Sequence, residues 1–160
     1  MTDIVIVDRR FSRPTVDRFW SKVEKGRDCW LWLGGKRSGY GLFWLGDRHV
    51  SAHRLSWLLD GRELPTNLML DHLCFDRACV NPEHLRVVTN KQNQEHRSGP
   101  TVLSTSGYLG VSRTGRRWKA EVRHNGKRHY FGTYPTRAEA AAAVQAGRDA
   151  LYTHHERMSA

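Results

Sequence analysis

The chain has 160 residues and carries 26 Lys or Arg against 16 Asp or Glu, which gives a formal net charge of +10. That length suits one ordinary domain or two small ones, and the charge is typical of a protein that binds a polyphosphate. A merely soluble basic protein, or one that coats anionic membranes, would carry a similar charge. No apolar run reaches the roughly 18 residues of a membrane-spanning helix, and residues 1–8 lack the segments of a signal peptide, so we expect neither.

The first predicted elements are a helix over residues 16–23, where apolar side chains recur at helical spacing, and strands over residues 29–33 and 40–45. Gly and Ser residues between the two strands mark a turn region. A second helix is predicted over residues 51–60, with Ser51 as its N-cap.

A short strand over residues 68–70 then leads into Asp71 and His72, and Asn81-Pro82 should open a helix or turn, because proline suits a first helical position. The large aromatic side chains of this part are expected in the core rather than on a stacking platform. They include Trp30, Trp32, Trp44 and Trp57.

Residues 98–107 are small, polar and punctuated by Gly and Pro, which is typical of a linker. Before residue 98 the chain holds 16 basic and 12 acidic residues, and from residue 98 onward it holds 10 and 4. All three cysteines precede this stretch. We therefore predict one domain over residues 1–97, a linker over residues 98–106 and a second domain over residues 107–160.

Three strands and one helix are predicted for the second part. Residues 108–113 are strand-like, and residues 117–123 alternate between an apolar and a charged face. Asn125-Gly126 is a strong hairpin signal, and residues 127–134 follow as the third strand. A capping box, Thr136 to Glu139, opens an alanine-rich helix that should run to about residue 152. The face that carries the charged side chains holds the candidate DNA contacts Arg117, Lys119, Glu121, Arg123, Arg128 and Tyr130.

Cysteine and histidine spacing indicates a structural zinc site. Cys74, Cys79 and His84 follow one another at intervals of five positions, and Cys29 is the natural fourth ligand of a tetrahedron. The odd cysteine count fits poorly with a secreted disulfide framework and better with metal ligation in a reducing compartment. The competing interpretation is three buried thiols that act as small apolar side chains.

A hydrolytic site is predicted beside it. Cleaving a phosphodiester needs a deprotonated water and a cation, and the hard oxygens of Asp71 and Asn93 suit Mg²⁺ or Mn²⁺. His72 is the candidate base, because imidazole titrates near neutral pH. The alternative is that His72 is a satisfied structural histidine.

Several sequence runs resemble one nuclease superfamily. Cys-Trp-Leu-Trp, Gly-Tyr-Gly, Ala-His-Arg, Asp-His-Leu-Cys and Cys-Val-Asn-Pro-Glu-His-Leu are similar to the phage and intron-associated HNH homing endonucleases, which are ββα-metal nucleases. The order of residues also resembles the related His-Cys box enzymes, whose metal-binding asparagine follows the base by 21 positions. The matching residues are His72, Cys74, Cys79, His84 and Asn93.

This resemblance spans about residues 15–97 and implies His72 as the base, with Asp71 and Asn93 on the catalytic cation. The His-Cys box pattern does not fix an aspartate at the position of Asp71. Asn81 matches the HNH asparagine that braces the loop by hydrogen bonding, and Arg54 either clamps a phosphate or is an exposed structural arginine. The implied zinc ligands are Cys29, Cys74, Cys79 and His84.

The second part resembles the AP2/ERF DNA-binding domain through Tyr-x-Gly-Val, Trp-Lys-Ala-Glu-Val-Arg, Tyr-Phe-Gly-Thr-Tyr and Thr-x-x-Glu-Ala-Ala. That family places a three-stranded sheet in the major groove, and its contact positions match Glu121, Arg123, Arg128 and Tyr130. Leu109 and Ser112 stand where the plant family has arginines, so its sequence specificity does not carry over. A solvated basic face is the alternative.

The predicted fold class is α+β, a small zinc-stabilised ββα-metal nuclease domain followed by an AP2-like three-stranded antiparallel sheet with one helix. We expect a homing-type DNA endonuclease with catalytic Mg²⁺ or Mn²⁺ and structural Zn²⁺, whose C-terminal sheet anchors it on double-stranded DNA. We expect no membrane and no small-molecule cofactor, a cytoplasmic, phage-encoded protein, and either a monomer or a homodimer. The alternatives are a non-catalytic zinc-stabilised DNA-binding regulator and a zinc-stabilised interaction module without a nucleic-acid role.

Overall fold

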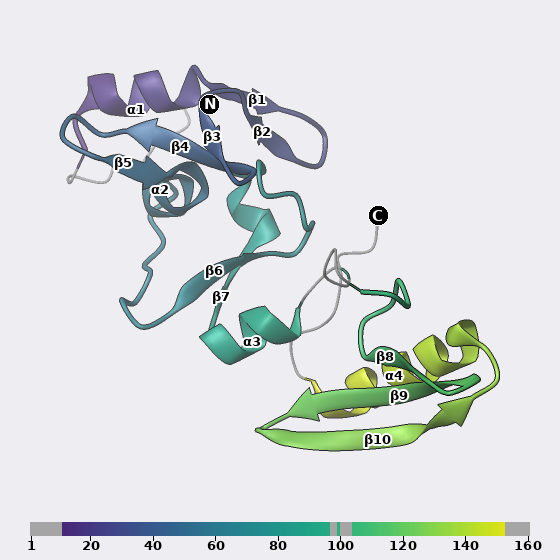
Figure 1. Cartoon of the computed structure of the whole chain (residues 1–160). Coiled ribbons are helices and arrows are strands. Elements are labelled where there is room, and N and C mark those ends of the chain that lie inside the picture. The colour runs from purple at the N-terminus through teal and green to yellow at the C-terminus, as the bar shows by residue number, and fades with distance from the viewer. Residues whose placement is uncertain (1–10, 97–98, 100–103, 153–160) are drawn as a thin grey trace. The chain divides into compact units, whose positions relative to one another are not determined.

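The computed structural model describes residues 11–96, 99 and 104–152 (Figure 1). Residues 1–8, on which the signal-peptide prediction rests, and most of the predicted linker lie outside that range. The described residues divide into two compact units, with the boundary between Asn90 and Lys91. Within the described part of the chain, every helix is too short or too polar to cross a bilayer.

The first unit begins with a helix and two small antiparallel sheets that enclose an aromatic core (Figure 1). Phe19 and Trp32 are fully buried, and their rings lie 5.1 Å apart. Phe43 packs against both rings, and α2 closes the core. The elements are α1 (Arg13–Trp20), the pair β1 (Val23–Lys25) and β2 (Trp30–Trp32), the sheet β3 (Lys36–Arg37), β4 (Tyr40–Trp44) and β5 (His49–Ser51), and α2 (Ala52–Leu59).

A second hairpin follows α2. Strands β6 (Met69–His72) and β7 (Leu85–Val88) pair in antiparallel register, which sets Asp71 opposite Arg86 and His72 opposite Leu85. Trp57 of α2, Leu70 and Leu85 form the small core beneath them. The loop between the strands ends in the short 3-10 helix η1 (Pro82–His84), as the Asn81-Pro82 pair predicted.

The second unit is a three-stranded antiparallel sheet covered on one face by a helix (Figure 1). Ala120 and Val122 point toward the helix and are buried, and Val144 and Ala140 of the helix pack on them. The elements are α3 (Asn90–Glu95), most of which belongs to this unit, then β8 (Val111–Thr114), β9 (Arg117–His124), β10 (Lys127–Tyr134) and α4 (Arg137–Leu151).

Local signals determined most of these elements. Asn125 and Gly126 both adopt positive φ, as a two-residue hairpin turn requires, and the Thr136–Glu139 capping box is present in both directions. The first predicted helix ends earlier than expected, because Val23 begins β1 instead of a last helical turn. Ser51 is at the N-cap of α2 as predicted, although its side chain makes no capping hydrogen bond.

The core of the first unit allows a direct stability test at Gly41. A Cβ atom there would lie 2.6 Å from the Trp32 ring and 2.9 Å from the Cβ of Ala52. We expect Gly41→Ala to destabilise the protein by about 1–3 kcal/mol, the usual cost of overpacking. Urea unfolding followed by tryptophan fluorescence measures this, with Gly35→Ala as the control, since a Cβ at Gly35 meets nothing within 4 Å. Equal stability of the two variants would contradict the packing described.

Candidate active site

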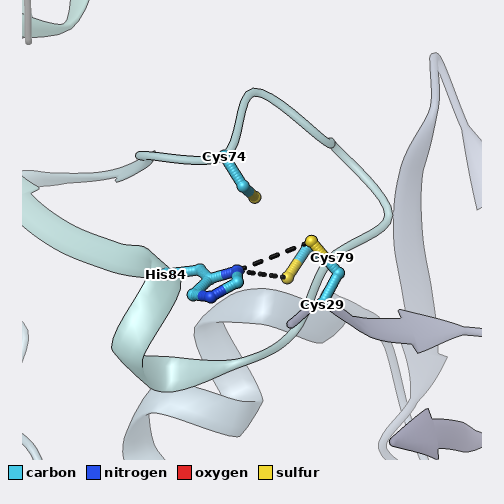
Figure 2. A group of neighbouring side chains, drawn as sticks. All are labelled: Cys29, Cys74, Cys79 and His84. Atoms are coloured by element: carbon cyan, nitrogen blue, oxygen red, sulfur yellow. Dashed lines mark hydrogen bonds between the residues drawn. The ribbon is translucent and has the colours of Figure 1, made fainter. Parts of the chain in front are cut away.

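Cys29, Cys74, Cys79 and His84 converge on one point in the first unit. Their ligand atoms all lie within 4.8 Å of one another, although the chain separates Cys29 from His84 by 55 positions. Figure 2 shows the side chains pointing toward one another, with Nδ1 of His84 at 3.5 Å from Sγ of Cys29 and 3.7 Å from Sγ of Cys79. A tetrahedral zinc with bonds of about 2.0–2.3 Å sets neighbouring ligand atoms roughly 3.5–3.8 Å apart. The donor set therefore fits Zn²⁺.

Main-chain hydrogen bonds place these ligands. The amide of Trp32 donates to the carbonyl of Ala78 at 2.9 Å, and the amide of Val80 donates to the carbonyl of Trp30 at 2.7 Å. The loop that carries Cys79 thus pairs with β2, which directly follows Cys29. Local pairing with a strand explains how a loop without regular structure can hold two ligands in place.

The three thiols influence one another's protonation. A hydrogen bond from the Cys79 thiol lowers the pKa of Cys74 to about 5, and the same contact raises the pKa of Cys79. Burial raises the pKa of Cys29. A thiolate that accepts hydrogen bonds from neighbouring thiols is a soft anionic ligand. A metal ion that replaced the thiol protons would stabilise the remaining cysteines as thiolates too.

Asn81 braces this loop. Its Nδ2 donates to the carbonyl of Asp28 at 2.9 Å, and its Oδ1 accepts from the amide of Glu83 at 3.1 Å, which caps η1. The buried amide thereby connects the segment before Cys29 to the turn that presents His84. Its contacts are those of a positioning group for the zinc ligands.

His72 is buried at the end of β6, with Nε2 at 3.1 Å from the carbonyl oxygen of Cys79. A carbonyl can only accept, so Nε2 carries the proton and Nδ1 of the neutral ring has the free lone pair. Burial is the largest effect on this ring and lowers the pKa of His72. A neutral imidazole held in one tautomer has the properties of a general base.

Two further residues with aromatic rings, neither of them predicted as a site residue, lie beside His72. The ring of His53 lies 4.8 Å from that of His72, edge to face, and the Tyr40 ring lies 5.9 Å away. His53 is buried, Nδ1 of its ring has no hydrogen-bond partner, and burial lowers its pKa to about 3. The helical spacing of α2 was the available signal, since it turns His53 inward and leaves its neighbour Arg54 exposed.

Asp71 forms an ion pair with Arg86, whose Nε and Nη2 both lie 3.1 Å from Oδ2 of the carboxylate. Arg86 was not among the predicted site residues, and the strand register that sets it opposite Asp71 could not be read before β7 was known. Any cation that binds Asp71 shares this carboxylate with a guanidinium. Asn93 lies on α3 in the second unit, so its role toward His72 stays a prediction.

The candidate DNA contacts lie on the sheet face opposite α4. Arg123 on β9 is directly opposite Arg128 on β10, and both side chains are exposed. Glu121 accepts from Lys119 at 3.2 Å and lies 3.8 Å from Arg128, while Tyr130 is 61% exposed. Arg117 donates to the carbonyl of Thr133 at 2.9 Å. Four of the six candidate side chains on this face are basic and one is acidic, so the face carries a net positive charge.

A comparison with protein families finds a match that covers most of the candidate active site. Residues 50–95 match the family model described as HNH endonuclease. This stretch includes Asp71, His72, three of the four Cys/His ligands and Asn93.

Two curated relatives come from Escherichia phage T7. Protein 7.7 is 36% identical over 69 residues, which cover 42% of this chain and 53% of that protein. Protein 2.8 is 34% identical over 68 residues, which cover 41% of this chain and 45% of that protein. The chain thus spans about half the length of the curated relatives it matches. No solved structure matches the chain.

The Cys/His cluster predicts one equivalent of bound zinc. We expect His84→Ala to lose this zinc and to destabilise the first unit, because the metal crosslinks β2 to the loop after β6. Elemental analysis and thermal unfolding measure both effects. His49→Ala, at an exposed histidine outside the cluster, is the matched control. A well-folded protein that contains no zinc, or a Cys74–Cys79 disulfide, would contradict the assignment.

Proposed function

We propose that the protein is a metal-dependent DNA endonuclease of the HNH homing type. The observation that carries the proposal is His72, which is buried, neutral and oriented by the carbonyl of a Cys/His-cluster residue, within the stretch that matches the HNH endonuclease model. A DNA-binding module without catalysis has no need of a base held in this way. The homing assignment rests on the sequence resemblance.

In the proposed reaction Nδ1 of His72 takes a proton from the attacking water, while the Nε2–H bond to Cys79 keeps the ring in its tautomer. A bound Mg²⁺ or Mn²⁺ supplies charge stabilisation at the phosphate and the leaving oxygen. Asp71 and Asn93 are the proposed oxygen ligands, and the chemistry of one carboxylate and one amide suits a hard cation. Arg86 orients the Asp71 carboxylate through their ion pair.

The structural role of the zinc in this proposal is to position the base. Cys79 contributes a thiol to the cluster and a carbonyl to His72, so an ordered loop around zinc fixes the imidazole. Asn81 supports the same loop. Arg54 is exposed on α2, where it could reach a phosphate of bound DNA.

The second unit is proposed to anchor the enzyme on duplex DNA in the manner of the AP2/ERF sheet. Two arginines directly opposite each other repel, and like-charged cross-strand pairs destabilise a sheet. Phosphates lying on Arg123 and Arg128 would offset that repulsion, and guanine edges would accept hydrogen bonds from both side chains. Tyr130, whose hydroxyl forms a hydrogen bond with that of Thr133, adds an exposed aromatic ring to the same face.

Cleavage tests the base assignment. We expect plasmid DNA to be cut in the presence of Mg²⁺ or Mn²⁺ and not in the presence of chelator, and His72→Ala to lower the rate about 10²-fold or more, the scale of general-base catalysis. His49→Ala, a substitution at an exposed histidine of the same unit, should retain the rate. A folded His72→Ala protein that cuts as fast as the unsubstituted protein would favour the non-catalytic regulator instead.

DNA affinity tests the anchor. Replacing Arg123 and Arg128 by Ala should weaken binding and flatten its salt dependence by about two charge equivalents, because fewer counterions are released. Loss of site preference would indicate base contacts, each worth roughly 1–3 kcal/mol, whereas a uniform loss would indicate phosphate contacts. Arg137→Ala on α4 is the control, and affinity measured against salt concentration is the readout. An unchanged affinity and salt slope would exclude this face as the anchor.

A further inference from the structure

A buried ionic network connects α3 to the sheet of the second unit. Glu95, at the end of α3, is only 7% exposed, and its Oε1 lies 3.0 Å from Nδ1 of His124 on β9 and 3.6 Å from Nζ of Lys91. The main-chain carbonyl of Glu95 accepts from Nη2 of Arg148 on α4 at 2.8 Å. Two elements of the C-terminal fold therefore hold one residue of a six-residue helix.

The protonation of His124 follows from its partners. A carboxylate can only accept, so Nδ1 of His124 donates to Glu95, and Nδ2 of Asn125 donates to Nε2 at 2.9 Å. The His124 ring also lies against Tyr152, with centroids 5.6 Å apart, and the tyrosine hydroxyl donates to the carbonyl of Arg123. These contacts fix the imidazole, so it can hold Glu95 in one place.

A helix of six residues has little stability of its own, since nucleation is costly and most helical stability comes from packing. Oε2 of Glu95 and Nε of Arg148 are buried without a hydrogen-bond partner, so both groups depend strongly on the contacts they do make. Breaking one contact would leave a buried charge poorly compensated, and α3 would lose its fixed position.

We propose that Glu95, His124 and Arg148 are positioning residues that hold the helix bearing Asn93, so that cleavage depends on the C-terminal fold for more than DNA binding. This rests on the proposed function, in which Asn93 binds the catalytic cation. The sequence predicts catalysis in the first domain and DNA binding in the second. In this proposal the second unit also contributes to catalysis, because it holds the helix that carries the predicted cation ligand. Groups that orient metal ligands typically contribute 10–100-fold to metal affinity or activity.

The test compares full-length variants at His124. His124→Leu removes the donor, and His124→Asn keeps an amide near the position of Nδ1. We expect His124→Leu to speed amide hydrogen exchange over residues 92–96 about 10-fold or more, the effect of losing one hydrogen bond to a charged group. Exchange in β8, β9 and β10 should stay as it was, and His124→Asn should restore much of the protection.

Cleavage and binding separate positioning from anchoring. In His124→Leu the Mg²⁺ concentration for half-maximal cutting should rise about 10-fold, while DNA affinity measured in chelator stays unchanged. Arg148→Met, which cuts the second link to Glu95, should act in the same direction if the leucine variant does not fold. Gln145→Ala, which removes an exposed hydrogen bond on α4, is the matched control.

Unchanged exchange in α3, or an unchanged Mg²⁺ requirement with active protein, would overturn the proposal. A loss of DNA affinity that accounts for the whole loss of cutting would overturn it too. If the unsubstituted protein cuts no DNA, the proposed function fails, and the exchange measurement still decides whether His124 holds α3.

Discussion

The convergence of three thiols and one imidazole on a single point constrains the rest of the first unit. Its cores are small, and the segment from Leu73 to Asn81 has no helix or strand of its own. A metal bound by residues up to 55 positions apart would stabilise such a loop, because its ligand bonds form only in the folded chain. The same loop supplies the carbonyl that lies against His72, so the candidate metal site and the candidate base both contact one residue, Cys79.

Charge organises the second unit in two different ways. On the outer face of the sheet Arg123 and Arg128 lie directly opposite each other, and Glu121 is the acidic side chain near Arg128. On its inner side the buried Glu95 is paired with His124 and Lys91. The exposed face carries the charge that we propose binds DNA, and the buried pair is the contact that we propose holds α3, the helix that carries Asn93.

Local chemistry was readable from the sequence. Strand β9 was predicted from the alternation in residues 117–123, the hairpin from Asn125-Gly126, and α4 from the Thr136–Glu139 capping box. The spacing of the Cys and His residues predicted the four side chains that the structure brings together. Contacts between distant residues could not be predicted from the sequence. Arg86 contacts Asp71 because of the β6–β7 register, and His53 contacts His72 because of how α2 packs. Glu95 carried no motif, since an isolated acidic residue is usually solvated. The AP2-like kinship and the predicted domain boundaries remain predictions.

Removing zinc tests most directly whether the Cys/His cluster holds the candidate base His72 in place. Plasmid cleavage would be measured in excess Mg²⁺ before and after extraction of zinc with a chelator selective for soft metals, and again after zinc is added back. We expect cutting to be lost with the zinc, not to be rescued by further Mg²⁺, and to return with one equivalent of Zn²⁺. Undiminished Mg²⁺-dependent cutting by zinc-free protein would contradict it.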